Sequence, residues 1–188
     1  MALSALVLCS RVLLRIGAQP VASFEEGTAE AEVAANLYPG TRDALLAAHP
    51  WSFATGQMVL PRLLDVPVDG TGAAFQLPAN CLRILSAGTL RGRGLDYRIH
   101  EKRLHADTDR VVLTYLFRPD ESAFPPHFAA ALVARLAAEF CIPLTDSTAR
   151  AEMLQRLAGS EFREARLTDS QQHTIQAIEG FPLIDVRG

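Results

Sequence analysis

The chain has 188 residues, of which 49% are hydrophobic and 21% are charged, and its formal net charge is -3. This composition favours neither an intrinsically disordered chain nor a generally basic nucleic-acid binder. The apolar content is enough for one core of ordinary size, or for a main domain with a small insertion.

The first predicted element is an amphipathic helix over residues 3–16. Its apolar residues recur at helical spacing, Arg11 and Arg15 fall on another face, and Gly17 is a natural stop. The two arginines inside the run favour a core-packing helix over a secretion signal. No later segment approaches the roughly 20 apolar residues of a membrane span, so we expect no contact with a membrane.

A second helix is predicted over the alanine-rich series that follows. Two N-caps are possible: Ser23, which with Glu26 resembles a capping box, and Thr28. We expect Pro39 to interrupt or kink this helix and Thr41 to restart it toward His49, because proline cannot donate the helical hydrogen bond.

Between residues 57 and 118 the spacing of the hydrophobic residues changes from helical to strand-like. Short runs of this kind are separated by Gly, Pro, Asp and Asn. Six strands of an antiparallel sheet are predicted, at 57–64, 74–77, 82–90, 97–100, 103–106 and 111–117. In the last strand Leu116 interrupts the more polar face. We therefore expect that face to meet another layer or another subunit.

Helical periodicity returns after the proline-rich break at 119–126. Large apolar residues fall four apart on one stripe, namely Phe128, Leu132, Leu136 and Phe140. Alanines flank this stripe, so neighbouring helices are expected to approach closely. Pro143 is predicted to end this helix, and a more polar helix is predicted over 148–173.

Together these elements predict an α+β fold that is mainly a helical bundle. Residues 1–56 and 119–179, the two chain ends, form the bundle, and residues 57–118 form an inserted, small antiparallel β module. Residues 180–188, the C-terminal arm, are apolar but too few to build a core. Such an arm is expected to dock on another surface.

The sequence shows no catalytic or metal-binding motif. Cys9, Cys81 and Cys141 stand far apart in apolar settings, which predicts reduced, buried thiols. His100 and His105 flank a predicted hairpin, where two surface histidines are favoured over a metal site. Neither a GxSxG nucleophile elbow nor a GxxxxGK[ST] phosphate loop occurs. We therefore expect neither an enzyme nor a bound cofactor.

One basic run has two interpretations. Arg91, Arg93 and Arg98 neutralise phosphate and Tyr97 can stack on a base, which would make a nucleic-acid contact. A solvated turn between two strands explains the same residues and is favoured. The excess of arginine over lysine is likewise open: a GC-rich genome explains it, and arginine also suits ion pairs between subunits.

Short features recur in a recognisable order along nearly the whole chain. In the first half they are Leu13-Leu14-Arg15-Ile16-Gly17, Pro20-Val21 with Ser23, the alanine-rich stretch of residues 29–35, and residues 42–46. Trp51-Ser52-Phe53-Ala54 follows and leads into Val59-Leu60-Pro61. In the second half they are Leu77-Pro78 with Asn80, Arg118-Pro119, Phe124-Pro125-Pro126 with Phe128 leading into Leu132, Arg135 and Phe140, and Arg163-Glu164-Ala165-Arg166. This order resembles the tail tubular protein A family, the head-to-tail adaptors of short-tailed phages and related gene transfer agents.

The resemblance implies a structural role in the neck of a virion or gene-transfer-agent particle made in the bacterial host cytoplasm. Copies are expected to form a ring, twelve-fold by analogy, between the portal protein and the tail nozzle or stopper. Double-stranded DNA would pass through the ring without sequence-specific binding. The arm is expected to dock on the portal or a neighbouring subunit, with packing on its own bundle as the alternative; its apolar residues are Phe181, Leu183, Ile184 and Val186.

A second functional hypothesis belongs to another class. A small DNA-binding accessory or packaging protein would use Arg91, Arg93, Tyr97 and Arg98. That hypothesis predicts salt-dependent DNA binding by the isolated chain. The adaptor hypothesis predicts weak or no DNA binding and oligomerisation that depends on the portal.

Overall fold

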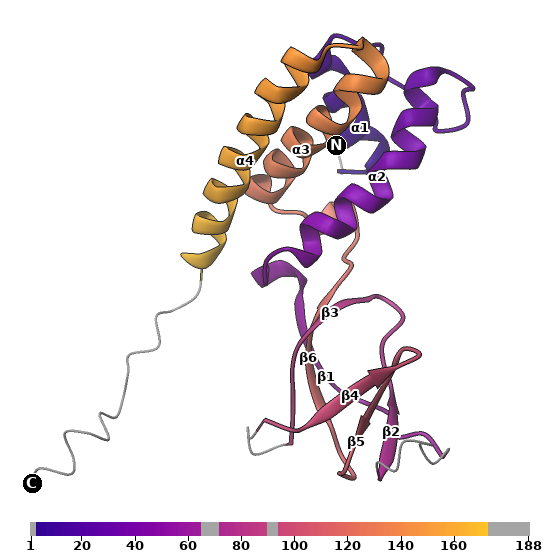
Figure 1. Ribbon diagram of the computed structural model, residues 1–188, viewed down its shortest axis with the longest axis vertical. Helices are drawn as coiled ribbons and strands as arrows, with labels where there is room; N and C mark the ends of the chain where they lie inside the picture. The colour runs from indigo at the N-terminus through magenta and orange to yellow at the C-terminus, as the bar shows by residue number, and fades with distance from the viewer. Residues whose placement is uncertain (1–2, 65–71, 90–93, 173–188) are drawn as a thin grey trace, which may run out of the picture.

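The computed structural model describes residues 3–64, 72–89 and 94–172. Within them, four helices form a bundle, and two three-stranded antiparallel sheets form a β module at one end of that bundle (Figure 1). The bundle is made from both chain ends and the β module is inserted between them. The α+β fold predicted from the sequence is confirmed.

Helix α1 (Ala5–Ile16) ends where the sequence indicates and begins two residues later than predicted. The Ser4 side chain accepts a hydrogen bond from the Val7 N–H at 3.3 Å, which caps the first turn. Gly17 follows with a φ of 81°, a left-handed conformation that costs glycine little. The helix buries one face, made of Leu8, Cys9, Val12, Leu13 and Ile16.

Helix α2 (Ala29–Ala47) takes the second of its two possible N-caps. Thr28 Oγ1 accepts a hydrogen bond from the Ala31 N–H at 3.2 Å. The Ser23 and Glu26 pair instead closes a turn before the helix: Glu26 Oε1 accepts from the Ser23 N–H at 2.8 Å. Gly27, with a φ of 73°, then redirects the chain toward α2.

Of the two outcomes predicted for Pro39, an interruption or a kink, the interruption is wrong, because α2 continues through Pro39 to Ala47. Pro39 lies on the exposed side of the helix, and so does Ala35, whose carbonyl loses its donor. Water satisfies a carbonyl at such a position. On the opposite side, buried Tyr38 and Leu45 keep the helix packed on the bundle.

Helix α3 (Pro126–Thr145) is the central element, and α1, α2 and α4 (Thr148–Ser170) all pack against it. The predicted stripe is completely buried, with Phe128, Leu132, Leu136 and Phe140 all at 0% exposure. The helix ends at Thr145 and not at Pro143, because Asp146 adopts the left-handed conformation that terminates it. A proline in the last turn costs only one helical hydrogen bond.

Helix α3 also corrects the expectation that no segment approaches the length of a membrane span. By length and composition it is apolar enough to cross a membrane, with a mean hydropathy of 1.6. In the fold, 56% of its apolar window is buried inside the chain. Because three helices pack against it, α3 occupies the environment of a core helix.

The β module contains all six predicted strands. One sheet has the order β1-β6-β3, with β1 (Thr55–Val59), β6 (Val112–Phe117) and β3 (Cys81–Gly88). The other has the order β2-β5-β4, with β2 (Ala73–Gln76), β5 (Arg103–Ala106) and β4 (Tyr97–His100). β1 is shorter than predicted because Pro61 has no N–H with which to continue the ladder.

The β module has a hydrophobic core separate from that of the bundle. Phe75, Leu104, Val111 and Leu113 are fully buried in it. Leu116, on the other face of β6, is also fully buried. The face that was predicted to meet another layer or subunit is therefore covered at Leu116 within the chain itself.

The C-terminal half of α2 is bonded to the β module. Arg83 of β3 donates a hydrogen bond from Nη1 to the carbonyl of Ala47 at 2.7 Å. Arg118, which follows β6, pairs with Asp43 through two hydrogen bonds, the one from Nε being 2.9 Å. Burial acts to raise the pKa of Asp43, but hydrogen bonds from Arg118 and Arg42 outweigh it and lower that pKa.

The same part of α2 holds the connection between β6 and α3. Glu121, in the short 3-10 helix η2 (Glu121–Ala123), accepts hydrogen bonds from Tyr38 Oη and Arg42 Nη1, both at 3.0 Å. Burial acts to raise the pKa of Glu121, but the hydrogen bonds made by its carboxylate, including these two, lower it overall. The joint between bundle and β module is thus built from charge-assisted hydrogen bonds.

Two neighbouring leucines of α1 provide a matched test of the bundle core. Leu13 is 0% exposed and Leu14 is 62% exposed. Leu13→Ala should lower the free energy of unfolding by about 2 to 5 kcal/mol, because it leaves a cavity against α3. Leu14→Ala should change it by less than about 0.5 kcal/mol. Equal losses in denaturant titrations would contradict this packing.

Candidate interaction surfaces

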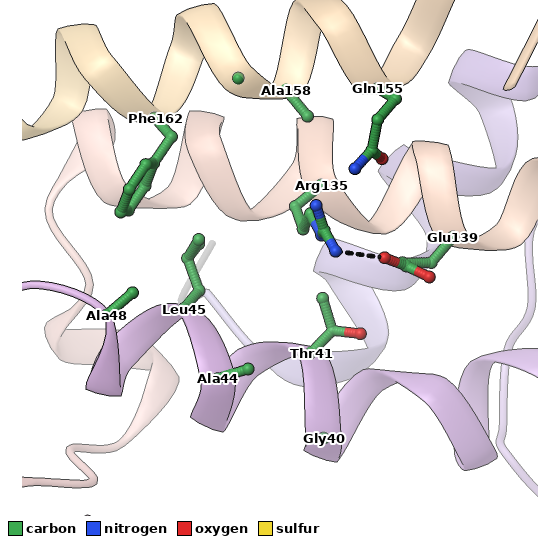
Figure 2. Close-up of a pocket in the computed structure, with 11 residues that line it drawn as sticks. Gly40, Thr41, Ala44, Leu45, Ala48, Arg135, Glu139, Gln155, Ala158 and Phe162 are labelled. Atoms are coloured by element: carbon green, nitrogen blue, oxygen red, sulfur yellow. Dashed lines mark ion pairs between the residues drawn. The ribbon is translucent and has the colours of Figure 1, made fainter. Parts of the chain in front are cut away.

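Helices α2 and α4 both pack against α3 and leave a groove between them, with a cavity volume of about 480 Å³ (Figure 2). Small residues make up much of both walls. On the α2 side these are Gly40, Ala44 and the C-cap residue Ala48, and on α4 they are Ala158 and Gly159. The floor is formed by Arg135 and Glu139 of α3.

The groove has an apolar end and a charged end. At the apolar end, Phe162 of α4 and Leu45 of α2 point toward each other across the groove (Figure 2). At the other end, Arg135 Nη2 and Glu139 Oε1 form an ion pair at 2.7 Å, with Gln155 above it. The apolar end lies nearer the C-terminus of α4, since residue numbers along α4 rise toward Phe162.

A buried carboxylate joins the end of α4 to the start of the β module. Asp169 is 1% exposed. It accepts hydrogen bonds from the Ser52 N–H at 3.0 Å and from the Ser52 hydroxyl at 2.7 Å. Ser52 opens the short 3-10 helix η1 (Ser52–Ala54), which leads directly into β1.

Two histidines lie near this carboxylate. His49 Nε2 is 3.8 Å from Asp169 Oδ2, and His127 Nε2 is 3.7 Å from Oδ1. The ring of Trp51 lies against both imidazoles, with centroid distances of 4.8 and 6.3 Å. Burial lowers the pKa of His49, nearby Arg166 adds to this effect, and Asp169 opposes it.

The residues around Asp169 include the types found in serine hydrolases, but their hydrogen bonds connect them in a different order. An activated serine donates its hydroxyl proton to an imidazole, which a carboxylate then orients. Here the Ser52 hydroxyl donates directly to Asp169. His127 Nε2 is buried without a hydrogen-bond partner among the described residues. The arrangement therefore fixes the joint and does not activate a nucleophile.

The predicted nucleic-acid residues are only partly covered by the structure. Arg91 and Arg93 lie outside the described residues. Tyr97 and Arg98 are neighbours on β4, an edge strand, so their side chains point to opposite sides. Arg98 is exposed, whereas Tyr97 is partly buried and packs on the core of the β module. A base could stack on Tyr97 only where that packing leaves the ring open.

The hairpin predicted at Glu101 and Lys102 is confirmed, since both residues adopt positive φ angles, 46° and 62°. It brings the rings of His100 and His105 to a centroid distance of 5.4 Å. His105 is buried, so the prediction of two surface histidines is wrong for that residue. The described residues contain no group of three or more ligands that could hold a metal ion.

The three cysteines are free thiols. Cys9 and Cys141 are buried as predicted, whereas Cys81 is only partly buried in β3. Burial, together with the charge of Glu121, raises the pKa of Cys9 to about 12. Burial also raises the pKa of Cys81. The raised pKa values keep the Cys9 and Cys81 thiols protonated and weakly reactive.

The residues predicted to dock on a portal or neighbour also lie outside the described residues: Phe181, Leu183, Ile184 and Val186. Comparison with known proteins gives no match, since neither a family model nor a curated protein matches this chain. The resemblance to the adaptor family therefore stays a hypothesis. The structure itself shows a chain of two connected parts with an open groove on the helical bundle.

The bond between Ser52 and Asp169 can be tested by removing one hydroxyl. Ser52→Ala should lower the free energy of unfolding by about 1 to 3 kcal/mol, because a buried carboxylate loses a hydrogen-bond donor. Ser86→Ala, the same substitution at an exposed position of β3, is the matched control and should have little effect. A Ser52→Ala variant as stable as the control would show that the bond does not hold the joint.

The lowered pKa of His49 predicts a pH dependence of stability. Because the ordinary value is 6.5 and the folded value is lower, the unfolded chain binds the proton first as the pH falls. The contribution of His49 is therefore complete above about pH 7.5, begins to be lost below about 6.5 and is lost as the pH falls through the lower folded pKa. His49→Gln should reduce the difference in unfolding free energy between about pH 7.5 and 5.5. An unchanged difference would refute the assignment.

Proposed function

We propose that this chain is the subunit of a head-to-tail adaptor, a ring that encloses the DNA channel between a portal protein and a tail nozzle or stopper. The observation that carries the proposal is the jointed, elongated shape: the helical bundle lies at one end and the β module at the other (Figure 1). The order of sequence features that resembles the tail tubular protein A family supports the same role.

An adaptor subunit needs different surfaces at its two ends and a fixed distance between them. The hydrogen bonds from Arg83 and Arg118 fix the β module relative to the bundle, and the bond from Arg42 to Glu121 holds the connection between β6 and α3. The Ser52 and Asp169 bond adds a connection to α4. A subunit held at these several points can carry load between two partners without bending at the joint.

Ring closure also requires lateral contacts between copies. Several large apolar side chains of the bundle are exposed, namely Leu14, Ile142, Met153 and Leu167. In a ring, the surface of one copy meets a different surface of the next. Burial of these exposed side chains against a neighbour would stabilise such contacts.

The charge of the chain suits a channel through which DNA slides. A formal net charge of -3 opposes adhesion of phosphates to the wall. The alternative function, a small DNA-binding accessory or packaging protein, depends on Arg91, Arg93, Tyr97 and Arg98. It is less well supported, because Tyr97 packs on the core of the β module and is not fully available to bases.

The direct test of the proposed function is a pull-down of the tagged chain from particle-producing cells, with partners and stoichiometry read by mass spectrometry. Recovery with portal and tail proteins in a fixed ratio would support the adaptor. Recovery of the chain alone, or with DNA and replication factors, would refute it. Salt-dependent DNA binding by the purified chain would favour the alternative function.

Deletion of residues 180–188 tests the role of the arm in attachment. The bundle and β module should remain folded, as measured by circular dichroism and thermal unfolding, because their cores lie within the described residues. Copurification with the portal should fall to background. Particles with a normal content of the truncated chain would show that the arm is not needed for attachment.

A further inference from the structure

We propose that, in the free subunit, residues 181–187 of the arm occupy the groove between α2 and α4 of their own chain. This inference deepens the proposed function and rests on it in one respect, since the same arm is assigned to portal attachment. The groove would hold the arm until a partner takes it. Four properties of the chain lead to this assignment: the reach of the arm, its direction, its charge and the fit of the groove to an extended segment.

The arm is long enough to reach the groove. Helix α4 ends at Ser170, and the apolar end of the groove is at Phe162. The ten residues from 162 to 172 correspond to about 15 Å along a helix axis. The eight residues 173–180 span up to about 26 Å when extended. Phe181 can therefore turn back and contact Phe162.

The direction of the arm matches the polarity of the groove. An arm that starts at the C-terminus of α4 enters from the apolar end and runs antiparallel to α4. Its sequence has the same order, because Phe181, Leu183 and Ile184 come first and Asp185 and Arg187 follow. The apolar residues would thus lie between Leu45 and Phe162, where apolar burial stabilises them.

The charged ends of arm and groove are complementary. The floor at that end carries Arg135 and Glu139, whose side chains are 41% and 37% exposed. Asp185 would lie near Arg135, and Arg187 near Glu139. The ion pair of Arg135 and Glu139 would then become a network of four charges. Because partly exposed ion pairs contribute little to stability, this network would mainly fix the register of the arm in the groove.

The walls of the groove suit an extended segment. Ala44, Ala48 and Ala158 have short side chains, so a peptide backbone can approach both helices closely. The interval from Phe162 to Gln155 corresponds to about 10 Å of helix. Residues 181–184 cover about the same length when extended. The apolar part of the arm therefore fits between the two ends of the groove.

A disulfide trap in the isolated full-length chain tests the inference. In a Cys81→Ser background, Ala44→Cys is combined with Pro182→Cys; Ala44 is exposed in the groove wall. Under mild oxidation at low concentration, this pair should form an intramolecular disulfide about tenfold faster than a control pair. The control, Ala35→Cys with Pro182→Cys, uses an exposed alanine of the same helix that does not line the groove.

A third variant distinguishes specific binding of the arm in the groove from the proximity that the covalent connection to α4 alone would give. Phe181→Asp, added to the Ala44→Cys and Pro182→Cys pair, should reduce the rate to that of the control. Equal rates for the two pairs, or a rate that Phe181→Asp leaves unchanged, would overturn the inference. Disulfide-linked dimers in place of intramolecular bonds would also overturn it, because the occupant would then be the arm of a second copy.

The trap does not depend on the adaptor function, because it contains no portal protein. A failed trap with a successful portal pull-down would remove only the assignment of the groove. A successful trap with no portal in the pull-down would support binding of the arm in the groove and refute the proposed function. The two failures are therefore distinguishable.

Discussion

The constraint on which the rest of the structure depends is the burial of helix α3. Its stripe of Phe128, Leu132, Leu136 and Phe140 is fully buried, and alanines between these residues let other helices approach. Each large side chain contributes about 1.5 to 3 kcal/mol by leaving water. Such a helix is stable in water only when other elements cover it, and α1, α2 and α4 do so. The groove between α2 and α4 is a consequence of this arrangement.

The second constraint is the way in which the β module is held. Its core is separate from that of the bundle, and Leu82 of β3 is the side chain of the described β strands that packs on the bundle core, so the two parts need a further connection. Polar bonds supply that connection, from Arg83 and Arg118 on one side and from Ser52 to Asp169 on the other. These bonds are directional, and they set the orientation of the β module as well as its attachment. An adaptor that must span a fixed distance requires this property.

Features with a local cause could be predicted from the sequence. The six strands and the stripe of α3 follow from hydrophobic periodicity, and the end of α1 follows from Gly17. The predicted interruption at Pro39 was wrong because tertiary packing outweighed the local preference of proline, with Tyr38 and Leu45 buried on the far side of α2. Asp169 could not be foreseen as a partner of Ser52, since 117 residues separate them. Neither could the groove, which exists only once α2 and α4 lie on α3.

The adaptor role can be examined most directly by electron microscopy of purified particles that carry the tagged chain. The account predicts a closed ring at the neck, between portal and tail, into whose density the bundle and the β module fit as one body, with DNA or its channel on the axis. Label elsewhere on the particle, or purified particles that lack the chain, would contradict the assignment of this protein to the head-to-tail connection.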